Sequence, residues 1–186
     1  GLIACGEDEA GGFDTGLPED KPINQLTDDE AVQACRAFEA YVGDLVPADF
    51  SARAGCLGES TIAAVSEGTA ACEQALADCL EASTTPPDEP SDFMCESAST
   101  AGLETCTATV GQIEECFTLL GEAFRLFESY TACDSLANAD RRNAVAADLD
   151  AVADQGQALC GDLAMDGCSE LDFGAFFAGI EALAGR

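Results

Sequence analysis

Apolar side chains recur every three or four positions along most of this chain, which is the spacing of one face of an α-helix. The strongest such stripe lies between residues 109 and 130. Its members are Ile113, Phe117, Leu120, Phe124 and Phe127. Thr109 and Gln112 match the capping box that begins many helices, because each side chain can satisfy a backbone amide of the first turn. This segment therefore predicts a long helix at the centre of the core.

The same spacing predicts three helices before it. A capping box of Thr27 and Glu30 begins the first, and the second starts after Pro47. We expect Gly58 to interrupt that second helix, since glycine weakens a helix interior. A third stripe predicts a helix over residues 69–82.

Two amphipathic segments follow the central helix. Residues 138–163 carry an apolar seam in alternating steps of four and three, which favours packing along another helix of the same chain. The seam consists of Val145, Leu149, Val152, Gly156, Leu159 and Leu163. Residues 172–183 carry a candidate interaction face made of Phe173, Phe176, Phe177, Ile180 and Leu183. We favour a terminal helix docked on the core there, and an exposed partner-binding helix is the alternative.

These segments predict an all-α fold, a disulfide-stapled helical bundle of about five to seven helices. Residues 1–24 are expected to precede the domain and to include an acidic, glycine-rich, flexible tether over residues 7–20. The domain itself would span residues 25–186. It would comprise one lobe over residues 25–82 and another over residues 95–186, joined by a proline-rich connector over residues 83–94.

Eleven cysteines occur in a chain that has no histidine and no C-x-x-C pair, which favours disulfides over zinc and places the protein outside the cytosol. Ten of them are candidates for five bridges: Cys35, Cys56, Cys72, Cys79, Cys95, Cys106, Cys116, Cys133, Cys160 and Cys168. Cys72 and Cys79 cannot bond each other, because seven helical residues span roughly 10.5 Å. A bridge from Cys79 to Cys95 would close the connector, and the other pairings stay open. The cysteine spacing in the two lobes is similar enough to raise an internal duplication as a hypothesis.

The eleventh cysteine ends the sequence Leu2-Ile3-Ala4-Cys5, which resembles the lipobox of bacterial lipoproteins. We therefore predict that Cys5 is lipid-modified, and an ordinary buried or bridging cysteine is the alternative. With the cysteine-bearing helices, including the stretch from Thr107 to Cys116, the chain resembles uncharacterised cysteine-rich lipoproteins common in myxobacteria. That resemblance implies location in the cell envelope and implies no known activity.

Charge and residue usage exclude several classes of function. Aspartate and glutamate total 36 against seven lysines and arginines, and the formal charge of −29 repels phosphate backbones and anionic lipids. Without histidine, Ser-His-Asp and Cys-His catalysis are excluded. Lys21 is the single lysine, so Schiff-base chemistry is disfavoured. The chain has no apolar run of about 20 residues that could span a bilayer.

Two short motifs match known sites only in part. Residues 13–16 contain the Asp-Thr-Gly triplet of aspartic proteases, but that chemistry needs a second carboxylate in a strand-based site. Residues 166–173 resemble half of an EF-hand loop, but Ser169 stands at its glycine position and Ala175 at its glutamate position. Neither motif is read as functional.

We expect a non-enzymatic envelope or surface lipoprotein that displays a rigid acidic helical domain for contact with another surface protein or matrix. It would meet the membrane through its lipid anchor alone, bind no nucleic acid and carry no cofactor. The alternative is a self-assembling subunit of an extracellular fibre or layer. A minor alternative is a low-affinity calcium module that uses Asp148, Asp150 and Asp154.

Overall fold

A computed structural model describes residues 12–47, 49–83, 94–165 and 167–168. Within these ranges the chain forms six α-helices and two 3-10 helices, and its only β-type pairing is an isolated bridge between Pro22 and Thr109. The all-α, disulfide-stapled prediction is confirmed. The elements are η1 (Ile23–Gln25), α1 (Asp28–Leu45), α2 (Phe50–Glu67), α3 (Thr69–Ala82), η2 (Cys95–Ser97), α4 (Val110–Thr131), α5 (Cys133–Ala137) and α6 (Ala139–Met165).

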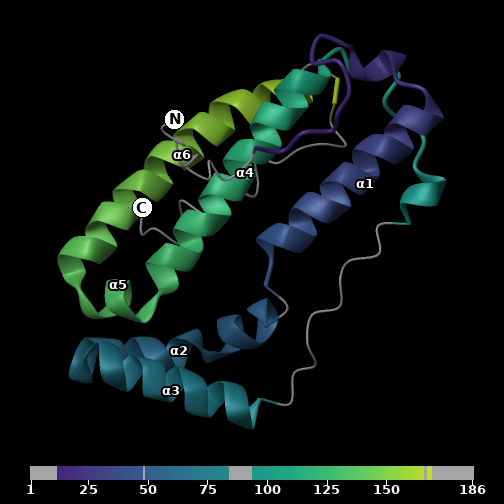
Figure 1. The fold of residues 1–186 in the computed structure, drawn as a ribbon. Helices are drawn as coiled ribbons and strands as arrows, with labels where there is room; N and C mark the ends of the chain where they lie inside the picture. Colours follow the sequence, from purple (N-terminus) through teal and green to yellow (C-terminus); the bar gives the residue numbers. More distant parts are fainter. Residues whose placement is uncertain (1–11, 48, 84–93, 166, 169–186) are drawn as a thin grey trace, which may run out of the picture.

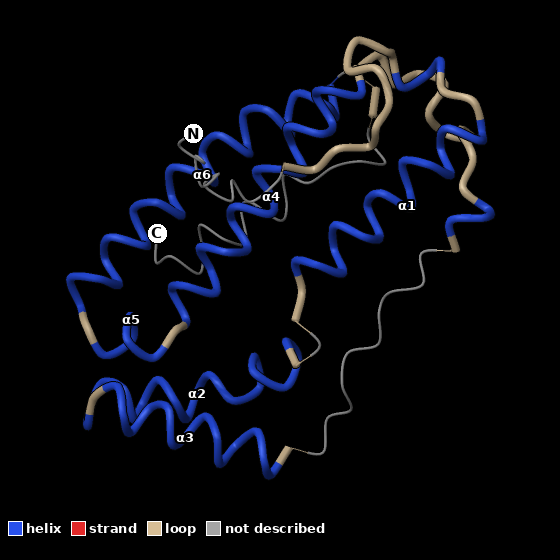
Figure 2. Tube along the Cα trace, in the orientation of Figure 1, coloured by secondary structure: helices blue, strands red, loops and turns tan. Residues whose placement is uncertain are grey.

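The helices form two pairs and one outlying helix (Figure 1). Helices α4 and α6 run antiparallel and in contact, and the short α5 joins their ends. Helices α2 and α3 form a second antiparallel pair, which lies across that end and contacts α5. Helix α1 runs along the other side of α4. Figure 2 shows that the loop segments gather at the opposite end, beside the first turns of α1 and α4.

Both predicted capping boxes are present. Thr27 accepts a hydrogen bond from the backbone of Glu30 and the Glu30 carboxylate accepts one from the backbone of Thr27, so α1 begins where the sequence predicts. Thr109 and Gln112 do the same at the start of α4. These bonds satisfy amide groups that a helix leaves without internal partners.

The main core lies between α4 and α6 and extends to the segment before α1. The seam predicted over residues 138–163 faces α4, with Leu149 and Leu163 almost fully buried. Intramolecular packing of this seam is therefore confirmed. A second, smaller core of Ala64, Cys72 and Leu136 joins α2, α3 and α5.

The predicted break of α2 at Gly58 is wrong. Helix α2 is continuous from Phe50 to Glu67, and a Cβ atom added at Gly58 would meet no neighbouring atom within 4 Å. An exposed glycine costs a helix only about 1 kcal/mol relative to alanine, which packing against α3 can offset.

The prediction of a flexible tether is wrong for residues 12–20. Phe13 and Thr15 are 6% and 7% exposed and lie against α4. Their hydrogen-bond partners lie about a hundred positions further along the chain, so the local sequence pattern could not predict that these two residues are buried. Residues 1–11 lie outside the described part of the chain.

All ten predicted cysteines form bridges, with Cα atoms 4.5 to 5.8 Å apart. The pairs are Cys35–Cys95, Cys56–Cys79, Cys72–Cys133, Cys106–Cys168 and Cys116–Cys160. Cys72 and Cys79 indeed bond different partners, but the suggested Cys79–Cys95 bridge is wrong. Five bridges indicate an oxidising, extracytoplasmic environment.

The bridges also bear on the two-lobe hypothesis. Two of them, Cys35–Cys95 and Cys72–Cys133, join residues 25–82 to residues 95–186. The pairing order within the first half differs from that in the second, so the connectivity does not repeat as an internal duplication would. No described helix is both long and apolar enough to cross a membrane.

Candidate functional site

An apolar cavity of about 370 Å³ lies between α1, the start of α4 and the two loop segments that precede these helices. Fifteen residues line it, and all except Thr15 and Ser99 are apolar. The loop segments contribute Phe13, Thr15, Leu17, Ile23, Leu26, Ala98, Ser99 and Leu103. The helices contribute Ala31, Ala34, Cys35, Phe38, Val110, Ile113 and Phe117.

Helix α1 forms one wall with a stripe that repeats at helical spacing. Ala31, Ala34, Cys35 and Phe38 lie at positions i, i+3, i+4 and i+7 and therefore share one face. The helix is amphipathic, yet none of its residues is fully buried. Its inner face thus borders open space where a packed core would place large side chains.

Aromatic rings close one end of the cavity. The Phe38 and Phe117 ring centroids lie 4.7 Å apart, and Phe13 contacts both at 6.1 and 5.1 Å. Tyr41 packs behind Phe13 at 5.4 Å and donates a hydrogen bond to the carbonyl of Phe117. Burial raises the pKa of the Tyr41 hydroxyl above its usual value of 10, so this group stays protonated as a donor.

The segment before α1 is fixed by hydrogen bonds to both helices. The Glu114 carboxylate in α4 accepts bonds from the backbone N–H and the hydroxyl of Thr15, both at 2.7 Å. Gln33 in α1 donates to the Thr15 carbonyl, and the Thr118 hydroxyl accepts from the N–H of Phe13. Because the Thr15 hydroxyl already donates its hydrogen bond to Glu114, it has no donor left for a polar group inside the cavity.

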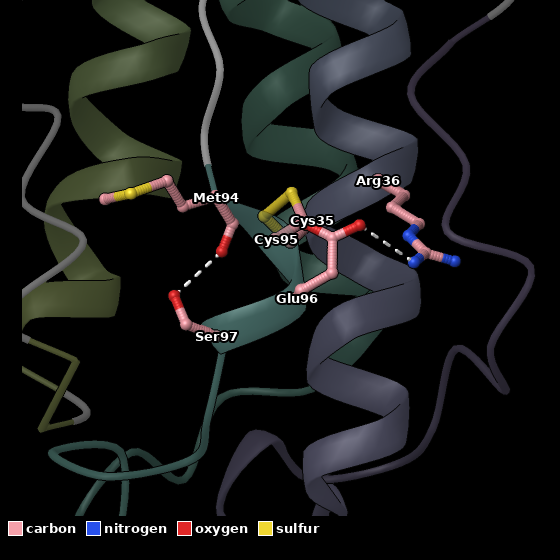
Figure 3. The surroundings of a disulfide bond; sticks show 6 residues. All are labelled: Cys35, Arg36, Met94, Cys95, Glu96 and Ser97. Atoms are coloured by element: carbon pink, nitrogen blue, oxygen red, sulfur yellow. Dashed lines mark hydrogen bonds and ion pairs between the residues drawn. A yellow bond between two sulfur atoms is a disulfide. The ribbon is translucent and has the colours of Figure 1, made fainter.

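A disulfide fixes the wall opposite α4. Figure 3 shows Cys35 of α1 bonded to Cys95 of η2, next to an exposed ion pair between Arg36 and Glu96 at 3.3 Å. Nearby, the Asp28 carboxylate accepts hydrogen bonds from the backbone N–H and the hydroxyl of Thr100. The segment from Cys95 to Thr100 is therefore attached to α1 by the disulfide at one end and by Asp28 at the other.

The first turn of α1 carries the largest electrostatic shift among the described residues. Lys21 lies 2.5 Å from the Glu30 carboxylate, and the backbone of Thr27 donates to the same group. Both contacts favour the charged form, and together they lower the pKa of Glu30 from 4.5 to about 2. The pair fixes the chain between η1 and α1 beside the cavity.

A second cleft, of about 410 Å³, lies between α2, α3, the end of α4 and α5. Its charged side chains are Arg53, Glu73, Glu128 and Asp134. Arg53 is paired with Asp49 at 2.6 Å, and Asp134 is paired with Arg141 at 2.5 Å. Two of its four charged groups thus already have partners.

The predicted calcium ligands do not form a site. Within the described ranges, no three cysteine, aspartate or glutamate side chains come together in a group that could hold a metal ion. Asp148, Asp150 and Asp154 are included in that statement. The described part of the chain therefore gives no support to the calcium hypothesis built on them, because calcium needs roughly six to eight oxygen ligands around one point.

The Asp-Thr-Gly triplet has a structural role. The Asp14 carboxylate accepts a hydrogen bond from the N–H of Gly16, and Thr15 bonds Glu114. These bonds shape a turn and attach it to α4. Of the other candidate residues, Cys5 and the apolar face over residues 172–183 lie outside the described residues.

Sequence reasoning missed the cavity. The signal that could have indicated it is the pair Ala31 and Ala34 on the inner face of α1, where the neighbouring inward positions are larger. Two small residues in successive turns leave room that a loop must either fill or leave open. Comparison with protein-family models, with curated proteins and with solved structures found no match to this chain.

Proposed function

We propose that the chain is a non-enzymatic, lipid-anchored envelope protein that displays a rigid acidic domain to another surface protein or to matrix. The observation that carries this proposal is the use of the cysteines. Five bridges consume ten of the eleven, and the remaining one is Cys5, at the end of Leu2-Ile3-Ala4-Cys5. A domain closed by five bridges needs no further thiol, which supports lipidation as the role of Cys5.

A large number of disulfide bridges suits an acidic protein that is exposed outside the cytosol. Like charges totalling −29 repel one another and weaken the compact state. Each bridge constrains the unfolded chain by about 2 to 4 kcal/mol, which offsets that repulsion where salt and proteases vary. The acidic surface favours partners with basic surfaces and disfavours nucleic acids.

The intact mass of protein taken from its native membrane fraction, with and without reductant, tests the proposal. We expect a chain that starts at Cys5, carries lipid and gains ten hydrogens on reduction of five bridges. Cys5→Ser should move the protein to the soluble fraction and leave its melting temperature unchanged. A chain that extends before Cys5 without lipid would overturn the anchor.

A second candidate function, a self-assembling extracellular subunit, is favoured by an apolar patch on α2. Ile62 and Val65 are 72% and 69% exposed and lie one turn apart. Replacing both with serine should abolish concentration-dependent assembly in sedimentation experiments, while Glu59→Ser on the same helix should not. Assembly should also rise with salt, because cations screen the acidic surface. A monomer at all concentrations and salts would exclude this candidate.

A further inference from the structure

The apolar cavity beside α1 has the size and lining of a small-molecule site. Its volume of about 370 Å³ lies within the range of roughly 300 to 1,000 Å³ that such pockets occupy. Its two polar side chains, Thr15 and Ser99, already bond to Glu114 and to the N–H of Ala101. The space therefore suits an apolar group.

The cavity is preformed, because its walls are fixed independently of any occupant. The bridge between Cys35 and Cys95 holds α1 to η2, and the bonds from Thr15 to Glu114 hold the first loop to α4. The main chain of Ile23 donates to the carbonyl of Ala108, which joins the two loops. Collapse of α1 onto α4 would have to break these contacts.

The charges around the cavity restrict the polar end of an occupant. Acidic groups bound to the surrounding loops include Asp28, Glu104 and Glu114. The basic groups on this side, Lys21 and Arg36, are paired with glutamates. An anionic head group would meet repulsion here, whereas a neutral or cationic one would not.

We propose that this cavity binds the apolar chain of a small, diffusible amphiphile with a neutral or cationic head group. The aromatic cluster of Phe13, Phe38 and Phe117 receives one end of the chain. The small side chains of Ala31 and Ala34 leave the cavity wide enough for that chain. This binding goes beyond the proposed envelope function and does not depend on the lipid at Cys5.

The test uses the full chain and the neutral fluorescent probe N-phenyl-1-naphthylamine. We expect saturable binding, and displacement by dodecyltrimethylammonium at a concentration at least about tenfold lower than by dodecanoate, both below their micellar concentrations. The preference for dodecyltrimethylammonium over dodecanoate should shrink at high salt, because screening weakens the repulsion between dodecanoate and the acidic groups around the cavity. Absence of saturable binding, or stronger displacement by dodecanoate, would overturn the proposal.

Variants of α1 locate the binding. Ala34→Phe fills the cavity and should weaken probe binding at least about tenfold, while Ala40→Phe on the exposed side of the same helix should change it less than about twofold. Ala98→Leu, in the loop segment that follows η2 and lines the cavity, gives an independent measurement should Ala34→Phe fail to fold by circular dichroism. Equal effects of the substitutions at residues 34 and 40, or no effect at residue 98, would place the probe elsewhere.

If residues 172–183, a second copy of the chain or the lipid at Cys5 fills the cavity, the full chain will not take up the probe, which also overturns the proposal.

Discussion

The Glu114 carboxylate binds Thr15 twice, through its backbone N–H and its hydroxyl, across 99 positions of sequence. We expect Glu114→Ala to lower the free energy of unfolding by about 2 kcal/mol, because hydrogen bonds to charged groups are strong and both donors are partly buried. Denaturant titration measures this loss. Limited proteolysis should also cut residues 12–20 faster in the variant.

Two matched variants control for charge and side-chain loss. Glu114→Gln keeps an oxygen that can accept both bonds and should lose less than half as much stability as the alanine variant. Glu115→Ala removes an exposed acid from the next position and should change stability by less than about 0.5 kcal/mol. Equal losses at residues 114 and 115 would contradict the role of the Thr15 contact.

That contact also shows where sequence reasoning stops. The capping boxes of α1 and α4 were predictable because both partners lie within four residues and their pattern is local. Phe13 and Thr15 sit in a glycine-rich acidic stretch without periodicity, and their burial depends on α4. The same applies to the disulfide pairing, which requires the packing of α2, α3 and α5 to be known first.

The Glu30 carboxylate links stability to pH. Its pKa is lowered from 4.5 to about 2, chiefly by Lys21, so its stabilising effect is complete above pH 4.5 and is lost as pH falls towards 2. We therefore expect Glu30→Gln to be less stable than wild type at pH 6, with the difference shrinking between pH 4.5 and 2. Thermal unfolding across this range measures it. Asp29→Asn removes the same charge from the same turn and should show a smaller difference at pH 6; a constant gap for Glu30→Gln at every pH would refute the linkage.

Two glycines should respond to alanine with opposite signs. A methyl group at Gly121 of α4 would meet the Tyr41 hydroxyl, and displacing that ring should lower the free energy of unfolding by about 1 to 3 kcal/mol. At Gly58 of α2 the added methyl group meets open space. The better helix propensity of alanine should there raise the free energy of unfolding by about 0.5 to 1 kcal/mol. Chemical denaturation compares the two. Tyr41→Phe in the Gly121→Ala background should recover part of the loss, and no recovery would assign the cost to another contact.

The cavity beside α1 and the continuous α2 illustrate a common physical reason for the remaining differences. Gly58 weakens α2 locally, but the Cys56–Cys79 bridge and contact with α3 outweigh a single glycine. Ala31 and Ala34 read as ordinary helical residues, and their effect appears only when two loops enclose the space in front of them. In both cases the tertiary partners decide what the local residues do.

The attachment of the α2–α3 pair rests on few interactions. Its shared core with α5 contains three buried hydrophobic residues, Ala64, Cys72 and Leu136, and one of them is itself a bridging cysteine. A ring contact between Phe50 and Phe124 at 5.1 Å adds a link to α4. The Cys72–Cys133 bridge is therefore the main restraint on the position of this pair.

Removing that bridge should release α2 and α3 as a unit while the α4–α6 pair stays folded. We expect the Cys72→Ser/Cys133→Ser variant to lose about 2 to 4 kcal/mol and to exchange the amide hydrogens of α2 and α3 faster, with those of α4 and α6 little changed. The matched variant Cys116→Ser/Cys160→Ser removes the bridge between α4 and α6 and should accelerate exchange in those helices. Because α4 and α6 also share the main core, their exchange should rise less than that of α2 and α3 does in the first variant. Uniform acceleration over all four helices in both variants would show that the domain unfolds as one cooperative unit.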